Sequence, residues 1–388
     1  MRILHTSDWH VGKTLRGASR LDEHRRVLAE IARVAADRRA DVVLVVGDIF
    51  ESAAPRPDAQ LVAWEALLAL RATGAQVVVV SGNHDHAEAF DAVRPVFAQL
   101  GITVAGHVAR ADSGGVVELA VDTASNARER VRIALLPWLA RHHVLRAEQL
   151  MDLEAGEGVQ VYAARVQKMI EHLCDGFGTD TVNIVAAHAY VRGGMRGGGE
   201  RIAQLADEYF VSPHAFPTTA TYVALGHLHR RQRIESGVPL WYCGSPVQVD
   251  FGDDTDPRGV LLIDAAPALP PKVEFVALDT PARLATITGT LEAIPTLAAQ
   301  AGADHLRVIV AEAPRPGLAE EVRALVPNAV DVSVAAVERA RTELPDARDH
   351  VQRAPRDLFG EYLDASGAAR DPALLALFDE LHDEASAP

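Results

Sequence analysis

Short β-branched runs that alternate with amphipathic helical patterns are the feature that most constrains the fold of this chain. The runs have the length of buried strands and are bounded by polar residues or glycine; they cover residues 2–6, 41–46, 76–80, 132–136, 182–187, 221–225, 240–243 and 259–263. Apolar residues recur at three- and four-residue spacing over 22–38, 60–73, 90–100 and 159–173, which predicts helices. Together these patterns predict an α/β fold of stacked sheets covered by helices.

The pattern changes near residue 279, after a proline-rich segment and a last strand at 273–278. The residues that follow predict a smaller α/β unit, with strands at 285–288, 305–310 and 329–334 and helices at 294–301 and 318–326. Beyond it lie a highly charged stretch and two short amphipathic helices, one around 358–363 and one that opens with Asp371 as cap and Pro372 in its first turn. We therefore expect domains at residues 1–278 and 279–337, and a linker with terminal helices at 338–388.

Composition narrows the classes of function. The formal net charge of −15 argues against a protein that coats DNA through a general positive field, so contact with nucleic acid is expected to be local or shared with a partner. No stretch approaches the ~18 apolar residues of a membrane span and the first residues fit no secretory signal, so we expect a soluble, cytoplasmic protein without membrane contact. Cys174 and Cys243 are too few for a disulfide framework, and we expect both to be reduced and buried.

Residues of the types that bind metal ions follow several of the predicted strands. In chain order they are Asp8 and His10, Asp48, Asn83 with His84 and Asp85, His188, and finally His227 and His229. In an α/β sheet the carboxyl ends of strands converge on one edge, so these loops are expected to meet. The donors are imidazole nitrogens and carboxylate or amide oxygens, a set that favours Mn²⁺ and that Mg²⁺, Fe²⁺ and Zn²⁺ also accept.

There are enough ligands for two divalent ions. Asp48, alone at its strand end, is the natural bridge if the ions lie ~3.5 to 4 Å apart. Each motif alone has a structural explanation: an Asp-x-His or Gly-Asp pair is more often a cap or a turn, and His188 alone is more often a core histidine. Gly-Asn-His-Asp after a buried strand is more specific, and the ordered combination favours the two-metal site.

The ordered set Asp8-x-His10, Gly-Asp48, Gly-Asn83-His-Asp, His188 and Gly-His227-Leu-His resembles the calcineurin-like metallophosphoesterase superfamily. Within it, the segments HTSDWHVGKT at 5–14, GDIF at 47–50, ALGHLH at 224–229 and YCGSP at 242–246 resemble the SbcD-type nucleases over residues 1 to about 265. The resemblance implies a four-layer αββα sandwich with two central sheets, followed by a small α/β capping domain that helps to position DNA.

The resemblance also implies roles for the site residues. Asp8, His10, Asp48 and His229 would hold one ion, and Asp48, Asn83, His188 and His227 the other. His84 would then act as a general acid that protonates the leaving 3′ oxygen. Its neighbour Asp85 either orients that ring or anchors the turn. Glu51 stands where some relatives carry a histidine, which leaves a phosphate-contacting role at that position open.

A metal-dependent DNA nuclease is the function that the resemblance implies. It would act as a 3′–5′ exonuclease on duplexes and an endonuclease on single strands and hairpins, in DNA repair, recombination and replication. The implied partner is the SbcC ATPase, in a complex with two copies of each chain, and the C-terminal helices are expected to bind it; docking on the chain's own capping domain is the alternative. A homodimer through the helices at 60–73 and 90–100 is also implied.

Two other functions remain open from the sequence. A phosphatase or small-molecule phosphodiesterase of the same superfamily would use the same ions without the dimer or the partner. A metal-bearing scaffold without catalysis is the second, and the intact ligand set together with His84 argues against it.

Overall fold

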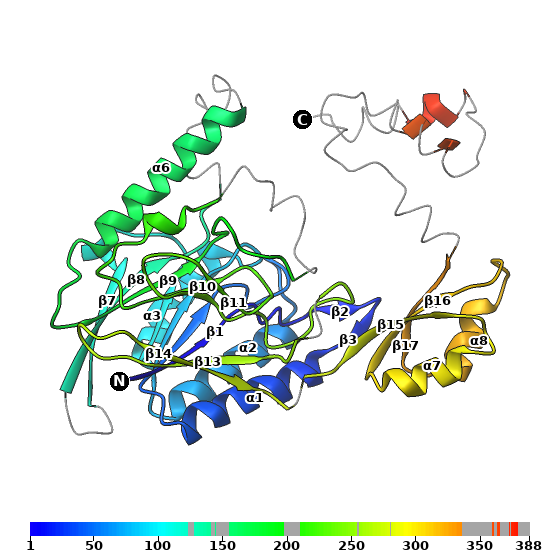
Figure 1. The fold of residues 1–388 in the computed structure, drawn as a ribbon, viewed down its shortest axis with the longest axis horizontal. Helices are drawn as coiled ribbons and strands as arrows, with labels where there is room; N and C mark the ends of the chain where they lie inside the picture. The colour runs from blue at the N-terminus through cyan, green and yellow to red at the C-terminus, as the bar shows by residue number, and fades with distance from the viewer. Residues whose placement is uncertain are drawn as a thin grey trace. The chain divides into compact units, whose positions relative to one another are not determined.

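The computed structural model describes residues 1–122, 128–140, 144, 155–197, 210–253, 256–279 and 281–335, and near the C-terminus residues 359–360, 363–364, 372 and 374–378. The chain divides into two compact units, Met1–Leu284 and Ala285–Pro388 (Figure 1). Cys174 and Cys243 are both free and buried, as predicted. Across the described residues, no helix combines the length and apolar character needed to cross a bilayer.

The first sheet contains two strands, at residues 42–46 and 76–80, whose sequences are almost entirely β-branched. Within the described residues it has six strands, in the order β14 (Lys272–Ala277), β13 (Gly259–Asp264), β1 (Arg2–Thr6), β4 (Val42–Val46), β5 (Gln76–Val80) and β6 (Ile102–Ala105). β1, β4, β5 and β6 are parallel, so their carboxyl ends lie at one edge. Every residue of β4 is buried, as expected for a strand covered on both faces.

The second sheet also contains four neighbouring parallel strands. In the described part of the chain its six strands follow the order β11 (Gln232–Ile234), β12 (Leu240–Tyr242), β10 (Tyr222–Gly226), β9 (Val182–His188), β8 (Arg128–Leu136) and β7 (Val116–Asp122). β8, β9, β10 and β12 are parallel, whereas the edge strands β7 and β11 are antiparallel to their neighbours. The carboxyl ends of β9 and β10 therefore lie side by side.

The two sheets stack face to face, with helices outside both. Ile3, Leu44, Ile133 and Ile184 belong to the apolar core between the sheets. The helices α1 (Leu21–Asp37), α2 (Pro57–Ala72) and α3 (Ala87–Gln99) cover the outer face of the first sheet, and α6 (Ala155–Cys174) covers that of the second (Figure 1). The predicted four-layer αββα architecture is thus confirmed.

The second unit is a small α/β structure with its own core. Its sheet has the order β15 (Leu284–Gly289), β16 (His305–Val310) and β17 (Ala329–Val334). The helices α7 (Ile294–Ala301) and α8 (Leu318–Leu325) contribute Ile294 and Val322 to this core. Near the C-terminus, residues 374–378 are helical, and Phe359 stacks on Phe378. Half of the predicted helix at 358–363 lies outside the described residues, as does Asp371, the predicted cap of the second terminal helix.

Several elements differ from those predicted. β6, β7 and β11, together with the short hairpin of β2 (Thr14–Leu15) and β3 (Ala18–Ser19), were not predicted. β7 lies at a sheet edge and its apolar run is interrupted by Glu118, so its signal is weaker than that of the buried valine runs of β4 and β5. α3 begins earlier than predicted because the Nδ1 atom of His86 accepts the N–H of Ala89 and caps the helix.

Candidate metal centre

Ligand-type side chains gather where strands of both sheets end. In the described part of the chain, donor atoms within 4.8 Å of one another come from Asp8, His10 and His229, from His10, Asp48 and His84, and from Asp48, His188 and His227. Because His10 and Asp48 each belong to two of these sets, the sets form one continuous group, which we call the ligand cluster. β1, β4 and β5 lead into it from the first sheet, and β9 and β10 from the second.

The backbone at several of these residues is strained. Asp8, His10, Asp48 and His227 have φ values of 53°, 49°, 50° and 107°, in a region that side chains other than glycine rarely adopt. The loop after β1 is held on the loop after β4, because Asp8 N–H donates to the carbonyl of Gly47 and His10 N–H to that of Asp48, both at 3.0 Å. Such strain persists only where neighbouring contacts fix the conformation, and it is typical of functional sites.

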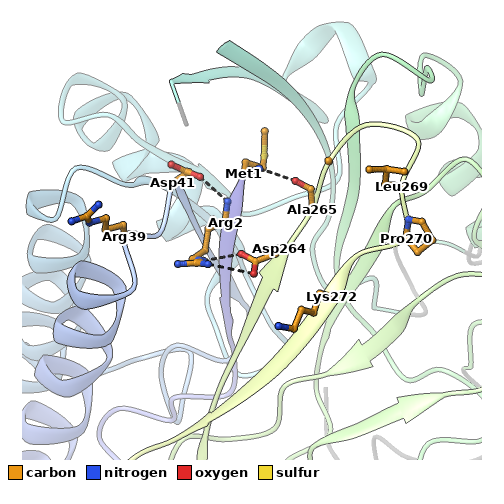
Figure 2. A pocket seen from close by; sticks show the side chains of 10 residues that line it. Met1, Arg2, Arg39, Asp41, Asp264, Ala265, Leu269, Pro270 and Lys272 are labelled. Carbon is orange, nitrogen blue, oxygen red and sulfur yellow. Dashed lines mark hydrogen bonds and ion pairs between the residues drawn. The ribbon is translucent and has the colours of Figure 1, made fainter. Parts of the chain in front are cut away.

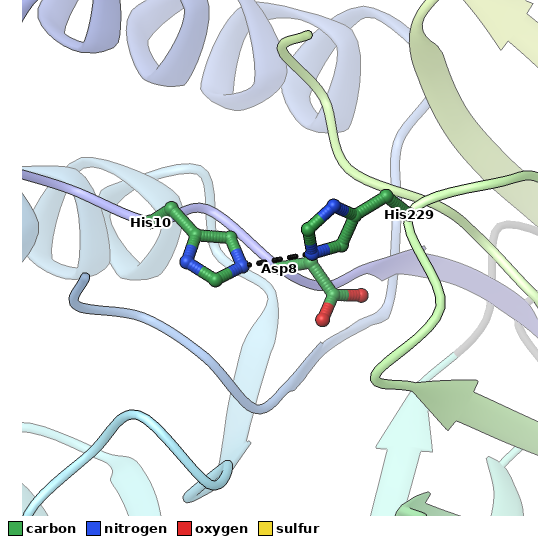
Figure 3. Close-up of side chains that lie close together, drawn as sticks. All are labelled: Asp8, His10 and His229. Carbon is green, nitrogen blue, oxygen red and sulfur yellow. Dashed lines mark hydrogen bonds between the residues drawn. The ribbon is translucent and has the colours of Figure 1, made fainter. Parts of the chain in front are cut away.

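In the first half of the cluster two histidines point at each other. The Nε2 atoms of His10 and His229 lie 3.1 Å apart, with Asp8 beside them (Figure 3). The Asp8 carboxylate accepts the N–H of His227 at 2.9 Å and the hydroxyl of Ser7 at 2.6 Å. Two buried ring nitrogens at this distance need a shared proton or a cation between them, and a neighbouring carboxylate favours the cation.

In the second half an amide oxygen lies between two histidines. Oδ1 of Asn83 is 3.0 Å from Nε2 of His188 and 2.8 Å from Nδ1 of His227. Oδ2 of Asp48 lies 3.5 Å from Nε2 of His188 and 3.8 Å from Nε2 of His10, so this carboxylate faces both halves. All the residues predicted as ligands therefore lie together, and the donor set fits a pair of divalent ions.

Burial and neighbouring charges set the protonation of the cluster. Burial raises the pKa of Asp8 to about 6 and lowers that of His10 to about 4. Burial raises the pKa of Asp48, but the imidazoles of His188, His10 and His84 together outweigh it and leave that pKa well below its usual value. Burial lowers the pKa of His188, but Asp48, Asp8 and a hydrogen bond to Val46 together raise it to about 9. A cation that binds there displaces the imidazole proton, because ligation needs a deprotonated nitrogen.

His84 is placed by the main chain. Its N–H donates to Oδ1 of Asp48 and its Nδ1 to the backbone carbonyl of Glu51, both at 2.8 Å. Its ring meets that of His10 edge to face, with the centroids 4.8 Å apart. His84 was predicted as a general acid and not as a ligand, and it lies within the same distance of the donor atoms as the ligands do.

Asp85 anchors the turn. Its buried carboxylate accepts the backbone N–H groups of Gly82 at 2.8 Å, Phe50 at 2.9 Å and Ile49 at 3.2 Å. Burial, with Asp48 nearby, raises its pKa to about 7. Of the two roles left open by the sequence, these contacts support the anchor, and the ring of His84 is oriented by Glu51 instead.

Further residues support the ligands through contacts that were not predicted from the sequence. Oε2 of Glu51 lies 3.0 Å from Nδ1 of His10, and Oδ1 of Asp253 lies 3.6 Å from Nδ1 of His229. The ring of Trp138 stacks on His227 with the centroids 5.0 Å apart. Trp138 follows the end of β8, a strand with no ligand-type residue at its end, so no contact with the site was predicted there. Asp253 carries no local sequence signal of this role.

Glycines beside the ligands allow close backbone approach. A Cβ atom on Gly82 would lie 2.1 Å from Oδ1 of Asp48, and one on Gly226 would lie 1.9 Å from the carbonyl oxygen of Val46. Both distances are far below van der Waals contact, so the loops after β5 and β10 can reach the cluster only with glycine at these positions.

A cavity of about 480 Å³ lies at the opposite end of β1 (Figure 2). Its charged groups largely satisfy one another: Arg2 pairs with Asp264 at 2.8 Å, the N–H of Arg2 donates to Asp41 at 2.6 Å, and the terminal amine of Met1 donates to the carbonyl of Ala265 at 2.7 Å. These contacts tie the first residues to the edge of the sheet, and the cavity contains no part of the ligand cluster.

Comparison with known proteins identifies the family. Residues 1–231 match the family model for calcineurin-like phosphoesterases. The SbcD subunit of the SbcCD nuclease from Bacillus subtilis is 34% identical over 271 residues, which cover 69% of this chain and 67% of that protein. The corresponding protein from Rhodobacter capsulatus is 34% identical, covering 70% and 68%, and that from Escherichia coli K12 is 28% identical, covering 76% and 72%. The chain therefore belongs to the calcineurin-like phosphoesterase family and, within it, to the group of SbcD nuclease subunits.

Proposed function

We propose that this chain is a metal-dependent nuclease that hydrolyses phosphodiester bonds in DNA. The observation that carries the proposal is the ligand cluster, in which imidazole, carboxylate and amide donors from both sheets lie within reach of one pair of ions. The relatives from three bacteria are named as components of the SbcCD nuclease, which supports a nucleic acid as the substrate.

Two divalent ions, with Mn²⁺ as the favoured metal, would be held by the residues of the cluster. Asp8, His10 and His229 would hold one ion, Asn83, His188 and His227 the other, and Asp48 would bridge them. When bound, such ions neutralise charge on the phosphate oxygens and lower the pKa of an attacking water. The buried imidazoles of His10 and His227 are suited to this task, because burial lowers their pKa values and they ligate without first losing a proton to solvent.

His84 would protonate the leaving oxygen. Because its Nδ1 donates to the carbonyl of Glu51, Nε2 is the ring atom left to exchange a proton with the substrate. The hydrogen bond from the backbone N–H of His84 to Asp48 keeps the His84 ring against the ligand cluster while the substrate binds. Proton transfer by a positioned imidazole needs no covalent intermediate with the protein.

The remaining parts of the chain would serve the complex. We infer that residues 279–337 form a capping domain that positions DNA and that residues 338–388 bind the SbcC ATPase, in a complex with two copies of each chain. Leu374 and Leu377 of the terminal helix are 39% and 49% exposed, which leaves apolar surface for a partner. The relatives are bacterial and are named for the same complex, which supports action in the bacterial cytoplasm.

A homodimer through α2 and α3 is part of this proposal. Leu61, Leu68, Val96 and Leu100 are 52%, 43%, 64% and 46% exposed, so these helices present apolar side chains to solvent. Trp64 and Phe97 of the same helices pack instead against the core of the first sheet. Light scattering during gel filtration tests this, and a monomer at micromolar concentration would count against the dimer.

One assay decides most of the function. The purified chain is incubated with duplex and hairpin DNA, in Mn²⁺ or Mg²⁺, with and without SbcC and ATP. We expect metal-dependent cleavage of duplex ends in the 3′–5′ direction and of hairpins, and no cleavage in EDTA. Activity on cyclic nucleotides far above that on DNA would favour the small-molecule phosphodiesterase instead.

A further inference from the structure

The two halves of the ligand cluster differ in what faces their histidines from behind. In the first half, His10 and His229 point their Nε2 atoms toward each other (Figure 3). Behind each ring stands a carboxylate: Oε2 of Glu51 lies 3.0 Å from Nδ1 of His10, and Oδ1 of Asp253 lies 3.6 Å from Nδ1 of His229. Each ring is thus placed between the cluster and a negative charge.

Both carboxylates are held in place. Oε1 of Glu51 pairs with Nζ of Lys13 at 2.9 Å, so its other oxygen stays directed at the cluster. The side chain of Asp253 is fully buried, and its Oδ2 accepts the N–H of Val249 at 2.6 Å and lies 3.9 Å from a guanidinium nitrogen of Arg258. These contacts fix the direction of each carboxylate, which is what orientation of a histidine ring requires.

On the side away from the cluster, the histidines of the second half lie against neutral groups. Nδ1 of His188 donates to the backbone carbonyl of Val46 at 3.0 Å. His227 turns Nδ1 toward Asn83 and stacks its ring on Trp138. The difference between the halves is one of charge, since the Asp253 carboxylate near Nδ1 of His229 lies just beyond hydrogen-bond distance, at 3.6 Å. The remaining ligands of the two halves also differ in charge. Asp8 adds a carboxylate to the first half, whereas Asn83 adds a neutral amide to the second.

A carboxylate behind a metal-binding histidine fixes its tautomer and raises the basicity of the ligating nitrogen, and its loss lowers metal affinity about 10- to 100-fold. We propose that Glu51 and Asp253 are positioning residues for His10 and His229, and that they make this half of the centre bind its divalent ion first and more tightly than the half that contains His188 and His227. The inference rests on the proposed function, which places an ion in each half.

The test is a titration of the chelator-treated, full-length chain with Mn²⁺. Free Mn²⁺ is followed by its electron paramagnetic resonance signal and the heat of binding by calorimetry. The wild-type chain is expected to show a tight and a weak class of site. Glu51→Gln and Asp253→Asn should each weaken the tight class about 10- to 100-fold and leave the weak class unchanged.

Further variants assign the classes to the two halves. His229→Ala should abolish the tight class, and His227→Ala the weak one. Asp91→Asn is the matched control, because Asp91 lies 2.7 Å from Nδ1 of His107, a histidine outside the ligand cluster. This variant makes the same chemical change behind a histidine and should leave both affinities as they are.

Three results would overturn the inference: an unchanged tight class in Glu51→Gln, equal weakening of both classes, or loss of the tight class in His227→Ala. Wild-type protein that binds no Mn²⁺ would instead overturn the proposed function itself. Glu51 is 24% exposed, so Glu51→Gln keeps the test decisive if thermal unfolding shows that Asp253→Asn does not fold.

Discussion

The Nδ1 atom of His84 donates a hydrogen bond to the backbone carbonyl of Glu51 at 2.8 Å. A carbonyl oxygen only accepts, so this contact places a proton on Nδ1 and leaves Nε2 as the ring atom that the proposed mechanism uses for proton transfer. The N–H of the same residue holds Asp48, a carboxylate that faces both halves of the ligand cluster. The proposed acid, His84, and the carboxylate of Asp48 are thus held together by a hydrogen bond from one backbone N–H group.

His84→Gln separates acid catalysis from metal binding. Glutamine retains a polar side chain but cannot deliver a proton to the leaving oxygen, so turnover on DNA should fall about 10²- to 10⁴-fold. The ligands are unchanged, and the Mn²⁺ content per chain should equal that of the wild type. Cleavage rates and metal content are measured on the same preparation. Turnover close to wild type would remove His84 from the mechanism.

Asp48→Asn should lose metal as well as activity. Asp48 lies near His10 and His188, and the neutral amide removes the negative charge that both halves share. We expect less than the wild-type Mn²⁺ content after dialysis and no detectable cleavage of DNA. Asp41→Asn serves as control, because Asp41 accepts the N–H of Arg2 at the opposite end of the strands. Full metal occupancy in Asp48→Asn would contradict its place as the bridge.

Asp85→Ala tests the anchor role. The variant leaves the N–H groups of Gly82, Ile49 and Phe50 without this acceptor, and each buried, unsatisfied group costs about 1–3 kcal/mol. The free energy of unfolding, measured with urea in EDTA, should therefore fall by roughly 3 kcal/mol or more. If Asp85 instead served only to orient His84, turnover would fall while stability stayed the same.

That the ligands meet at one edge could be predicted, because this follows from the local sequence pattern of the strands. Buried valine runs such as β4 and β5 predict parallel strands, and the carboxyl ends of such strands meet. The assignment of strands to two separate sheets could not be predicted from these runs, because it depends on pairing between distant segments. β1, for example, pairs with both β4 and the distant β13.

The supporting contacts were hidden for the same reason. Asp253 contacts His229 from a loop with no strand-end motif, and Glu51 in the loop after β4 contacts His10 in the loop after β1. A carboxylate in a loop has many ordinary explanations, and only the three-dimensional register shows which histidine it faces. Trp138 was missed as well, because its side chain is not a metal ligand and its stacking on His227 has no local sequence signal.

His24 should make the protein sensitive to acid independently of metal. This residue of α1 is buried, with its Nδ1 2.9 Å from the carbonyl of Arg20. Burial, followed by the charge of Arg20, lowers the pKa of His24 from 6.5 to about 4. Between these two values the unfolded chain binds more protons than the folded one, so the free energy of unfolding falls as the pH falls from 6.5 toward 4.

The slope of this loss approaches about 1.4 kcal/mol per pH unit for one histidine, and His24→Gln removes the contribution. Urea unfolding in EDTA at a series of pH values between about 7.5 and 4.5 should therefore show the wild type losing stability relative to His24→Gln only below about pH 6.5. The exposed His172 of α6 provides the control, and His172→Gln should run parallel to the wild type. A wild-type to His24→Gln difference that stays constant with pH would show that the buried ring accepts a proton without penalty. The acid sensitivity would then have to come from the ligand cluster, whose histidines His10 and His227 also have lowered pKa values because they are buried.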